Sequence, residues 1–137
     1  MPLHPTKEQF RAFAAAGRDG PVVMLNLLRF REVADYRDAP TLAGVGPVSG
    51  AEAYARYAKA MAPLLAEAGA ELVFRGPALP VLVGGADEAW DEVLLVRYPS
   101  ADAFAKMTSS DAYLAVTGHR TAALADARLI PVAPLAD

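Results

Sequence analysis

The chain contains no cysteine. Disulfides, thiolate zinc sites, iron–sulfur clusters and a cysteine nucleophile are therefore all excluded. A protein without disulfides suits a reducing compartment, so we expect a cytoplasmic location. Histidine is also scarce, because the sequence holds only His4 and His119, and this leaves few candidates for a general base of this type.

Features of membrane and nucleic-acid-binding proteins are lacking as well. No apolar run approaches the roughly 20 residues that span a bilayer, and the longest, residues 22–28, is interrupted by Asn26. The opening MPLHPTKEQF does not combine a basic region with an apolar stretch, so no signal peptide is expected. A net charge of −3 with scattered arginines argues against a nucleic-acid surface. We expect neither a membrane nor a nucleic acid as a partner.

Signatures of nucleotide, metal and cofactor sites are absent too. No GxGxxG or Walker pattern follows a strand-like segment, and the serines lack the glycine-flanked turn of a hydrolase nucleophile. The acidic residues at 87, 88, 91 and 92 form a cluster without further ligand groups, which favours a solvated turn over a metal site. The sequence predicts no metal and no cofactor.

What is present is an alternation of apolar strands and amphipathic helices. The 137 residues, 54% of them hydrophobic, suffice for the core of one domain over residues 1–137. The patterns predict strands at 22–30, 70–75, 93–98 and 128–132, and helices at 51–68, from 100, and from 110 to 126. Residues 80–85 either continue the second strand past a bulge or form a short extra strand. The order is β-α-β-β-α-β, the ferredoxin-like plan of the α+β class, an antiparallel sheet with helices on one face.

Two segments lie outside this plan. The N-terminal extension, residues 1–20, contains a predicted helix over 6–17 that begins with a capping-box pair, Thr6 and Gln9. Residues 34–49 lack periodicity and predict a long loop, which in a compact domain is a lid, a binding loop or a mobile segment. In the helix at 51–68, Ser49 and Glu52 form a second capping box, and Pro63 predicts a kink or a restart.

The first and third strands are apolar on both faces. In the ferredoxin-like plan these strands are central, and Pro131 marks the fourth strand as an edge because proline cannot donate in a central ladder. Two main helices cover one face only, and the other would expose an apolar patch beyond the few hundred Å² that monomers tolerate. A two-fold-related copy of the sheet is the economical cover. We therefore predict a homodimer whose sheets face each other as a dimeric α/β barrel; the alternative cover is the N-terminal helix with the long loop.

Five stretches between residues 21 and 132 carry a family resemblance. They are PVVMLNLLRF, the helix start YARY, VRYPSADAF, SSDAYLAV and HRTAALADARLIPV, and the positions that carry the likeness are Asn26, Tyr98, Pro99, Ser100, Tyr113 and Arg120. The chain resembles an uncharacterised bacterial family, domain of unknown function 1330, of the dimeric α/β-barrel superfamily. The resemblance implies the fold and no single activity, since that superfamily includes cofactor-free monooxygenases, haem-handling enzymes, isomerases, lyases and simple dimer modules. The N-terminal helix, the long loop and the stretch ADEAWDE are additions to the family's common short form.

Three polar residues on the predicted strands are candidate ligand contacts. Asn26 sits mid-strand among apolar neighbours, where its amide must find partners or cost a few kcal/mol. It either holds a substrate carbonyl or bonds a bulge or loop. Arg75 and Arg97 carry guanidinium groups that suit a carboxylate, which favours an acidic small molecule. The alternative for both arginines is an ion pair with a nearby acidic residue.

Four further residues complete the set of candidates. His119 is the weak candidate for a general base or a haem ligand, with a solvent-facing histidine as the alternative. Arg120 follows it, at a position that carries the family resemblance. Trp90 and Tyr98 offer flat walls for an aromatic ligand, although Trp90 also suits an interface.

Together these features predict a small acidic or aromatic ligand in a cavity between sheet and helices. A cofactor-free oxygenase, isomerase or lyase is one interpretation, and a non-catalytic homodimerisation or ligand-binding module is the alternative; a haem enzyme ranks third. The predicted ligand-binding residues are Asn26, Arg75, Trp90, Arg97, Tyr98 and Arg120, with His119 as the candidate for catalysis.

Overall fold

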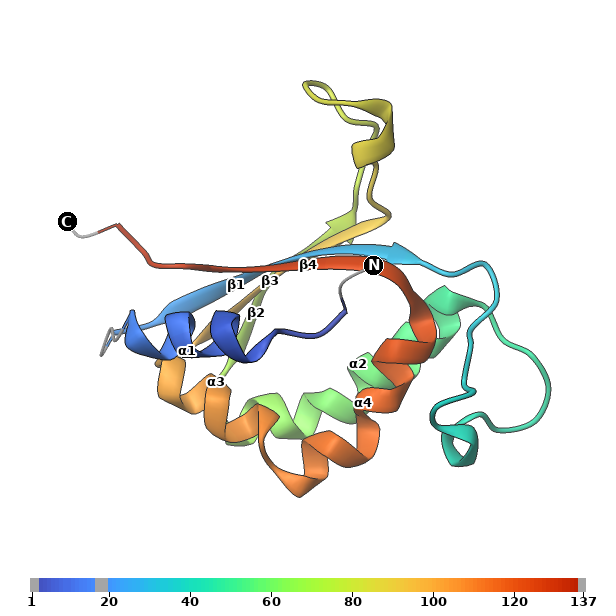
Figure 1. The fold of residues 1–137 in the computed structure, drawn as a ribbon, viewed down its shortest axis with the longest axis horizontal. Helices are drawn as coiled ribbons and strands as arrows, with labels where there is room; N and C mark the ends of the chain where they lie inside the picture. Colours follow the sequence, from blue (N-terminus) through green and yellow to red (C-terminus); the bar gives the residue numbers. More distant parts are fainter. Residues whose placement is uncertain (1–2, 17–19, 136–137) are drawn as a thin grey trace.

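Four antiparallel strands form the central layer of the fold (Figure 1). The computed structural model describes residues 3–16 and 20–135. The strands are β1 (Val22–Phe30), β2 (Glu71–Pro77), β3 (Glu92–Tyr98) and β4 (Leu124–Val132), in the order β2-β3-β1-β4. The two most apolar strands are central, and Pro131 lies on an edge strand opposite Met24. The ferredoxin-like prediction is confirmed; within one chain the sheet stays open.

The four α-helices of the described residues lie on one side of this sheet (Figure 1). They are α1 (Lys7–Ala15), α2 (Gly50–Glu67), α3 (Ala101–Thr108) and α4 (Asp111–Ala123). α1 joins the others because its apolar stripe packs on α3, with the Phe13 and Phe104 rings 5.7 Å apart and edge to face. The alternative in which this helix covers the second face is therefore wrong.

Helix starts follow the predicted caps more closely than helix ends do. Thr6 and Gln9 form the complete capping box of α1, whereas the predicted end of that helix at residue 17 lies outside the described residues. At α2 the structure shows half of the predicted box, in which the Glu52 N–H donates to Ser49 Oγ. The helix then runs through Pro63 as one element.

Two predictions about the strands are wrong. α4 ends at Ala123, and β4 begins at once with Leu124 rather than at residue 128, because β1 pairs along its length and reaches Leu124 through a bulge at Arg29/Phe30. Residues 80–85 are neither a strand nor a continuation of β2; they lie in the β2–β3 connection, which includes the short helix η2 (Ala86–Glu88). The bulge in β2 lies instead between Leu72 and Phe74.

The long loop is docked on the outer side of α2 and α4. The Asp35 N–H donates to the Ala122 carbonyl at 2.9 Å, and Arg56 Nη1 donates to the Ala43 carbonyl at 2.9 Å. The loop forms a short helix, η1 (Pro40–Leu42), beside α4. A side chain at Gly118 would lie 2.7 Å from Ala39 Cβ, so this glycine permits the close approach. The loop is a packed segment, and none of its residues lines the cavity described below.

The face of the sheet turned away from the helices is uncovered by any described element (Figure 1). Strand alternation places every second residue there. The register puts an apolar row across all four strands, made of Phe74, Leu95, Leu25 and Ile130. We call this surface the open face; its other members are Glu71, Arg97, Val23, Val132, Val93, Leu27, Arg128, Arg29 and Asp126.

Candidate functional site

A cavity of about 920 Å³ lies between the sheet and the helices. Side chains from all four strands and all four helices line it, and the chain before α1 contributes Leu3, His4 and Pro5. Its volume falls in the range of small-molecule sites, roughly 300–1,000 Å³. The cavity is therefore large enough to enclose a small organic molecule.

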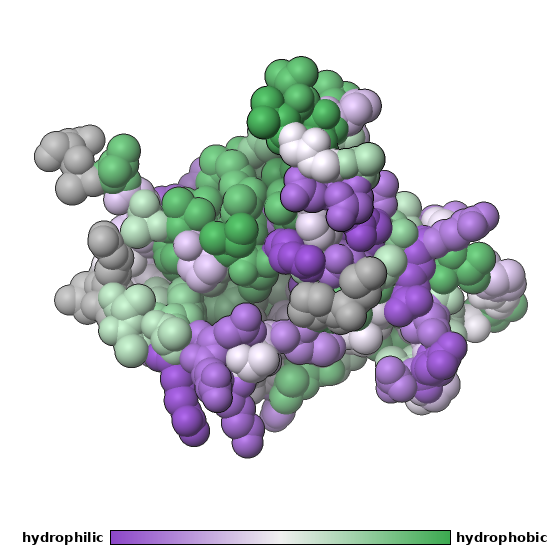
Figure 2. Space-filling model, turned by 45° about the horizontal axis from the view of Figure 1, so that its top comes forward, coloured by the Kyte–Doolittle hydropathy of each residue, from purple (hydrophilic) through white to green (hydrophobic). Residues whose placement is uncertain are grey.

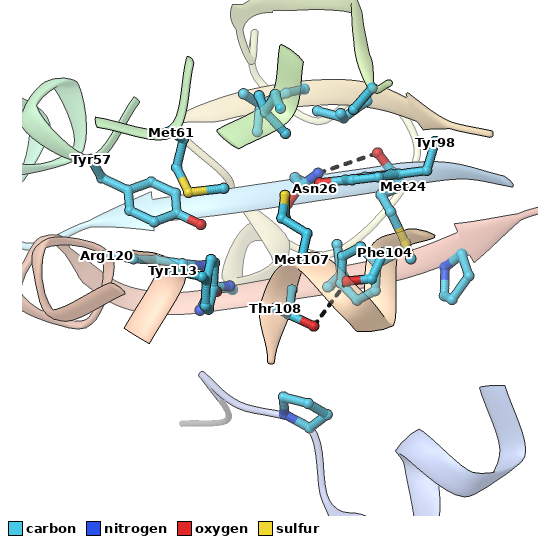
Figure 3. A pocket seen from close by; sticks show the side chains of 18 of the residues that line it. Met24, Asn26, Tyr57, Met61, Tyr98, Phe104, Met107, Thr108, Tyr113 and Arg120 are labelled. Carbon is cyan, nitrogen blue, oxygen red and sulfur yellow. Dashed lines mark hydrogen bonds between the residues drawn. The ribbon is translucent and has the colours of Figure 1, made fainter. Parts of the chain in front are cut away.

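Most of the wall is apolar and adaptable. Three methionines, Met24, Met61 and Met107, line the cavity together with the Phe104 ring (Figure 3). The Phe13 ring also lines it. Methionine side chains are flexible and polarisable, so they adjust to ligands of different shape. This wall suits an apolar body without a fixed outline.

Asn26 and Arg75 face the cavity from one row of the sheet. Asn26 pairs with Leu94, and Leu94 pairs with Arg75 on its other side. Asn26 Nδ2 donates to the Met24 carbonyl at 3.2 Å, while its Oδ1 accepts no hydrogen bond from the described residues. Arg75 makes an ion pair with Glu92, Nε to Oε2 2.8 Å, and lies over the Tyr54 ring at 5.9 Å. A ligand would therefore find a hydrogen-bond acceptor at Asn26 and an already neutralised guanidinium at Arg75.

Arg120 is the cation of the cavity that lacks an acidic partner. Its Nη1 donates to the Leu3 carbonyl at 2.6 Å, and within the described residues no carboxylate lies within 4.0 Å of it. No aspartate or glutamate is among the described residues that line the cavity. The wall is therefore positively charged at Arg120.

Buried phenols surround this positive charge. Burial raises the pKa of Tyr54 to about 12. Burial also raises the pKa of Tyr57 well above its usual value, and Tyr113 adds to this because two phenolates would repel each other. Figure 3 shows Tyr57, Tyr113 and Arg120 together at one end of the view. Tyr54 and Tyr57 therefore remain protonated at neutral pH, and their hydroxyls are available as hydrogen-bond donors.

Of the predicted ligand-binding residues, the structure brings four to the cavity: Asn26, Arg75, Tyr98 and Arg120. Tyr98 is buried, and its ring meets Phe104 edge to face at 5.0 Å. Burial raises the pKa of Tyr98 as well. These four residues come from three strands and one helix, and the fold brings them together at the cavity.

Arg97 and Trp90 lie on the other side of the sheet, so the prediction that they line the same cavity is corrected. Arg97 is exposed on the open face because its neighbours Val96 and Tyr98 point to the helices. Trp90 packs with two arginines of the open face, whose guanidinium carbons lie 4.8 Å (Arg29) and 5.2 Å (Arg128) from its ring centre. Trp90 thus stabilises the base of the β2–β3 connection.

His119 also lies outside the cavity, on the side of α4 that faces the long loop. Its Nδ1 is 2.8 Å from the hydroxyl of Tyr36, and Arg56 Nη1 donates to the same hydroxyl at 3.4 Å. Burial, followed by the positive charge of Arg56, lowers the pKa of His119. The arrangement connects a neutral histidine to the loop and gives it no contact with a cavity ligand.

We expect acidification to weaken the docking of the long loop through His119. Its pKa in the folded state lies below the unfolded value of about 6.5. As the pH falls below that value the unfolded chain takes up the proton first, so the free energy of unfolding declines. Urea unfolding at about pH 7.5 and about pH 5.5 should show a smaller decline for His119→Gln than for the wild type. Equal declines in the two proteins would exclude this role.

Sequence reasoning missed the contribution of the N-terminal extension to the cavity. Leu3, Phe10 and Phe13 line it, although α1 itself buries no residue completely. The signal was the apolar stripe of that helix, which pointed to a partner surface without identifying it.

The described residues hold neither a metal-binding cluster nor a membrane-spanning helix. No three histidine, aspartate or glutamate side chains gather there as a metal-binding group. None of the helices in ranges 3–16 and 20–135 combines the length and apolar character needed to cross a bilayer.

Comparisons with known proteins agree with the fold. The family model for the domain of unknown function DUF1330 matches residues 41–133. A protein of unknown function from Rhodopseudomonas palustris has a crystal structure similar to this one, with 40% sequence identity over 98% of both chains and a TM-score of 0.87. Among curated proteins the search finds no significant match.

Two more distant crystal structures share the architecture alone. One is a dimeric protein of unknown function with a ferredoxin-like fold from Bacteroides fragilis, 13% identical over 82% of this chain and 95% of that chain, with a TM-score of 0.50. The other is a dimeric ferredoxin-like protein of unknown function from Thermobifida fusca, 15% identical over 85% of this chain and 93% of that chain, also with a TM-score of 0.50.

Proposed function

This chain belongs to the DUF1330 family, and we propose that it is a homodimeric protein that binds an apolar small-molecule carboxylate between its sheet and its helices. One observation carries the proposal: Arg120 is a cation without an acidic partner, on the wall of a cavity that is otherwise largely apolar. Placing a charge in such surroundings is costly unless an opposite charge joins it. An anionic ligand would supply that charge.

The geometry gives the ligand an orientation. Its carboxylate meets Arg120 and accepts hydrogen bonds from the phenols of Tyr57 and Tyr113, and it replaces the Leu3 carbonyl that Arg120 holds in the free protein. Its apolar body extends along the methionine wall, past Met61 and Met107. A hydroxyl or amide on that body could donate to Asn26 Oδ1. The site therefore favours a molecule that is acidic at one end and apolar at the other.

Binding, rather than acid–base catalysis, is what the described residues of the cavity support best. Tyr54 and Tyr57 have raised pKa values and remain protonated, and His119, the candidate general base, lies behind α4 against Tyr36. The oxygenase, isomerase and lyase interpretations have no specific contact in their favour. A ligand-binding module agrees with the positions of all the candidate residues described above.

The homodimer part of the proposal rests on the open face. Its apolar row of Phe74, Leu95, Leu25 and Ile130 lies uncovered by the described part of this chain. Two distant structures with this fold are described as dimeric. A two-fold axis would place one open face on another, so each row would cover its copy.

Arg120→Met is expected to weaken carboxylate binding about tenfold or more, because charge-assisted hydrogen bonds contribute about 1.5–3 kcal/mol. We would titrate the wild-type protein calorimetrically with a series of ω-phenylalkanoates and the matching ω-phenylalkanols. Methionine keeps the unbranched apolar stem of arginine without its charge. Lys59→Met, which removes an exposed cation of α2, is the matched control.

The matching alcohols lack the carboxylate, so comparing them with the acids separates the contribution of the charge to binding from that of the apolar body. The proposal expects at least one acid of the series to bind more tightly than its alcohol, and Arg120→Met to remove that preference while Lys59→Met retains it. Acids and alcohols that bind equally to the wild type, or a series without any binding member, would contradict the proposal.

A further inference from the structure

The connection between β2 and β3 projects from the molecule on the side of the open face (Figure 1). We call residues 78–91 the arm. Three large aliphatic side chains of the arm are largely exposed, at 81% for Leu79, 97% for Leu82 and 92% for Val83, and the last two lie near its tip. Figure 2 shows hydrophobic residues both at the arm and over the neighbouring sheet surface. Single exposed aliphatic residues are common, but a projecting group of them marks an interaction site.

The base of the arm is held firmly. The Asp91 N–H donates to the Leu28 carbonyl at 2.7 Å, and Asp91 Oδ2 accepts from the Phe30 N–H at 2.8 Å. Arg29 Nη2 donates to the Ala89 carbonyl at 2.7 Å and stacks on Trp90. These contacts fix the direction of the arm, so its apolar tip stays in solvent in a single subunit.

We propose that the arm is a clasp whose occupant is a second copy of this chain: the apolar tip of each arm packs on the partner subunit when two open faces meet. The inference rests on the homodimer of the proposed function. Arm and open face lie on the same side of the sheet, so any body stacked on the face comes within reach of the arm. A two-fold axis gives both subunits the same face and the same arm, which makes this surface self-complementary.

Charge also favours a second copy over an unrelated partner. The arm carries Asp87, Glu88 and Asp91 and contains no lysine or arginine. The open face exposes Arg97, which has no carboxylate within 4.0 Å among the described residues. Arg97 lies at the end of β3 away from the arm of its own subunit. A two-fold axis that crosses the strands would carry the acidic arm of one subunit toward Arg97 of the other.

Leu82→Asp is expected to raise the dimer dissociation constant at least tenfold, because it places a charge where the clasp buries an aliphatic side chain. Sedimentation equilibrium over a range of concentrations measures this constant. Val45→Asp is the matched control, since Val45 is fully exposed in the loop beside α2 and α4. Both variants should keep the wild-type circular dichroism spectrum, because both positions are exposed in the single subunit.

A charge-reversal set tests the second contact. Arg97→Glu and the pair Asp87→Lys with Glu88→Lys should each weaken the dimer, and the combined variant should regain part of the loss. A wild-type dimer with the same dissociation constant in Leu82→Asp would overturn the clasp and leave the homodimer and the ligand site intact. A wild type that stays monomeric would overturn the homodimer and the clasp together, while the Arg120 titrations would still test the ligand site.

Discussion

Gly50→Ala is expected to destabilise the protein by about 3 kcal/mol or more, since a Cβ at this position has no free space. It would lie 2.2 Å from the Arg31 carbonyl oxygen, 2.6 Å from the Ala123 carbonyl oxygen and 2.7 Å from the Arg31 nitrogen. All three are backbone atoms, which cannot turn aside as the end of a flexible side chain can. The helix start or the neighbouring chain must shift to accommodate the methyl group.

The shift would break a junction that joins three elements. The Gly50 N–H donates to the Arg31 carbonyl at 3.0 Å, and the Arg31 N–H donates to the Ala123 carbonyl at 2.8 Å. The start of α2, the residue after β1 and the α4–β4 junction thus share one set of hydrogen bonds. Loss of these hydrogen bonds would add to the cost of overpacking. The combined cost is large compared with the free energy of unfolding of about 5–15 kcal/mol that is typical of small domains.

Urea unfolding followed by circular dichroism measures the effect of this substitution. Gly20→Ala is the matched control, because a Cβ there would meet no atom within 4 Å. The control should keep the wild-type midpoint, and Gly50→Ala should unfold at much lower urea or fail to fold. Equal midpoints for the two variants would show that the junction can relax at little cost.

Much of the fold could be predicted from the sequence, because local signals and the required topology agree. The apolar run at 22–30 and the caps at Thr6 and Ser49 each define a local element. The start of β4 could not be predicted in the same way. Its first residues, with alanines at 125 and 127, suit a helix or a strand, and pairing with β1 about a hundred residues earlier decides between them.

The site was harder to predict because the central strands are apolar on both faces. Residue parity correctly groups Arg97 with Val93 and Leu95, but it does not indicate which group faces the helices. Which group faces the helices is decided only when the helices pack on one face of the sheet, and this packing is tertiary structure that residue parity does not encode. Arg97 therefore falls on the open face, whereas Asn26 and Tyr98 fall in the cavity.

Contacts between distant parts of the chain explain the remaining differences. Arg120 reaches Leu3 across nearly the whole sequence, and Trp90 meets Arg128 only because β4 returns beside β1. No spacing rule links such positions. The family resemblance indicated that Arg120 was worth considering, and the fold decided that it faces a cavity.

Leu25→Glu is expected to raise the dimer dissociation constant by about a hundredfold or more, which corresponds to about 2.7 kcal/mol. Leu25 lies on a central strand in the apolar row of the open face, between Leu95 and Ile130. In the proposed dimer a carboxylate there would be buried against the partner's apolar row without a compensating cation, which costs several kcal/mol. In the free subunit the same carboxylate faces water, so the variant should remain folded.

Sedimentation equilibrium and the ω-phenylalkanoate titrations together make this test specific. The variant should sediment as a single chain of 14.4 kDa, while Leu114→Glu, at an exposed position of α4, should behave as the wild type does. Carboxylate binding should persist in the monomeric variant, because Arg120 and the cavity lie on the other side of the sheet. If Leu25→Glu stays dimeric with an unchanged dissociation constant, the open face is not the subunit interface, and another surface must bring the chains together.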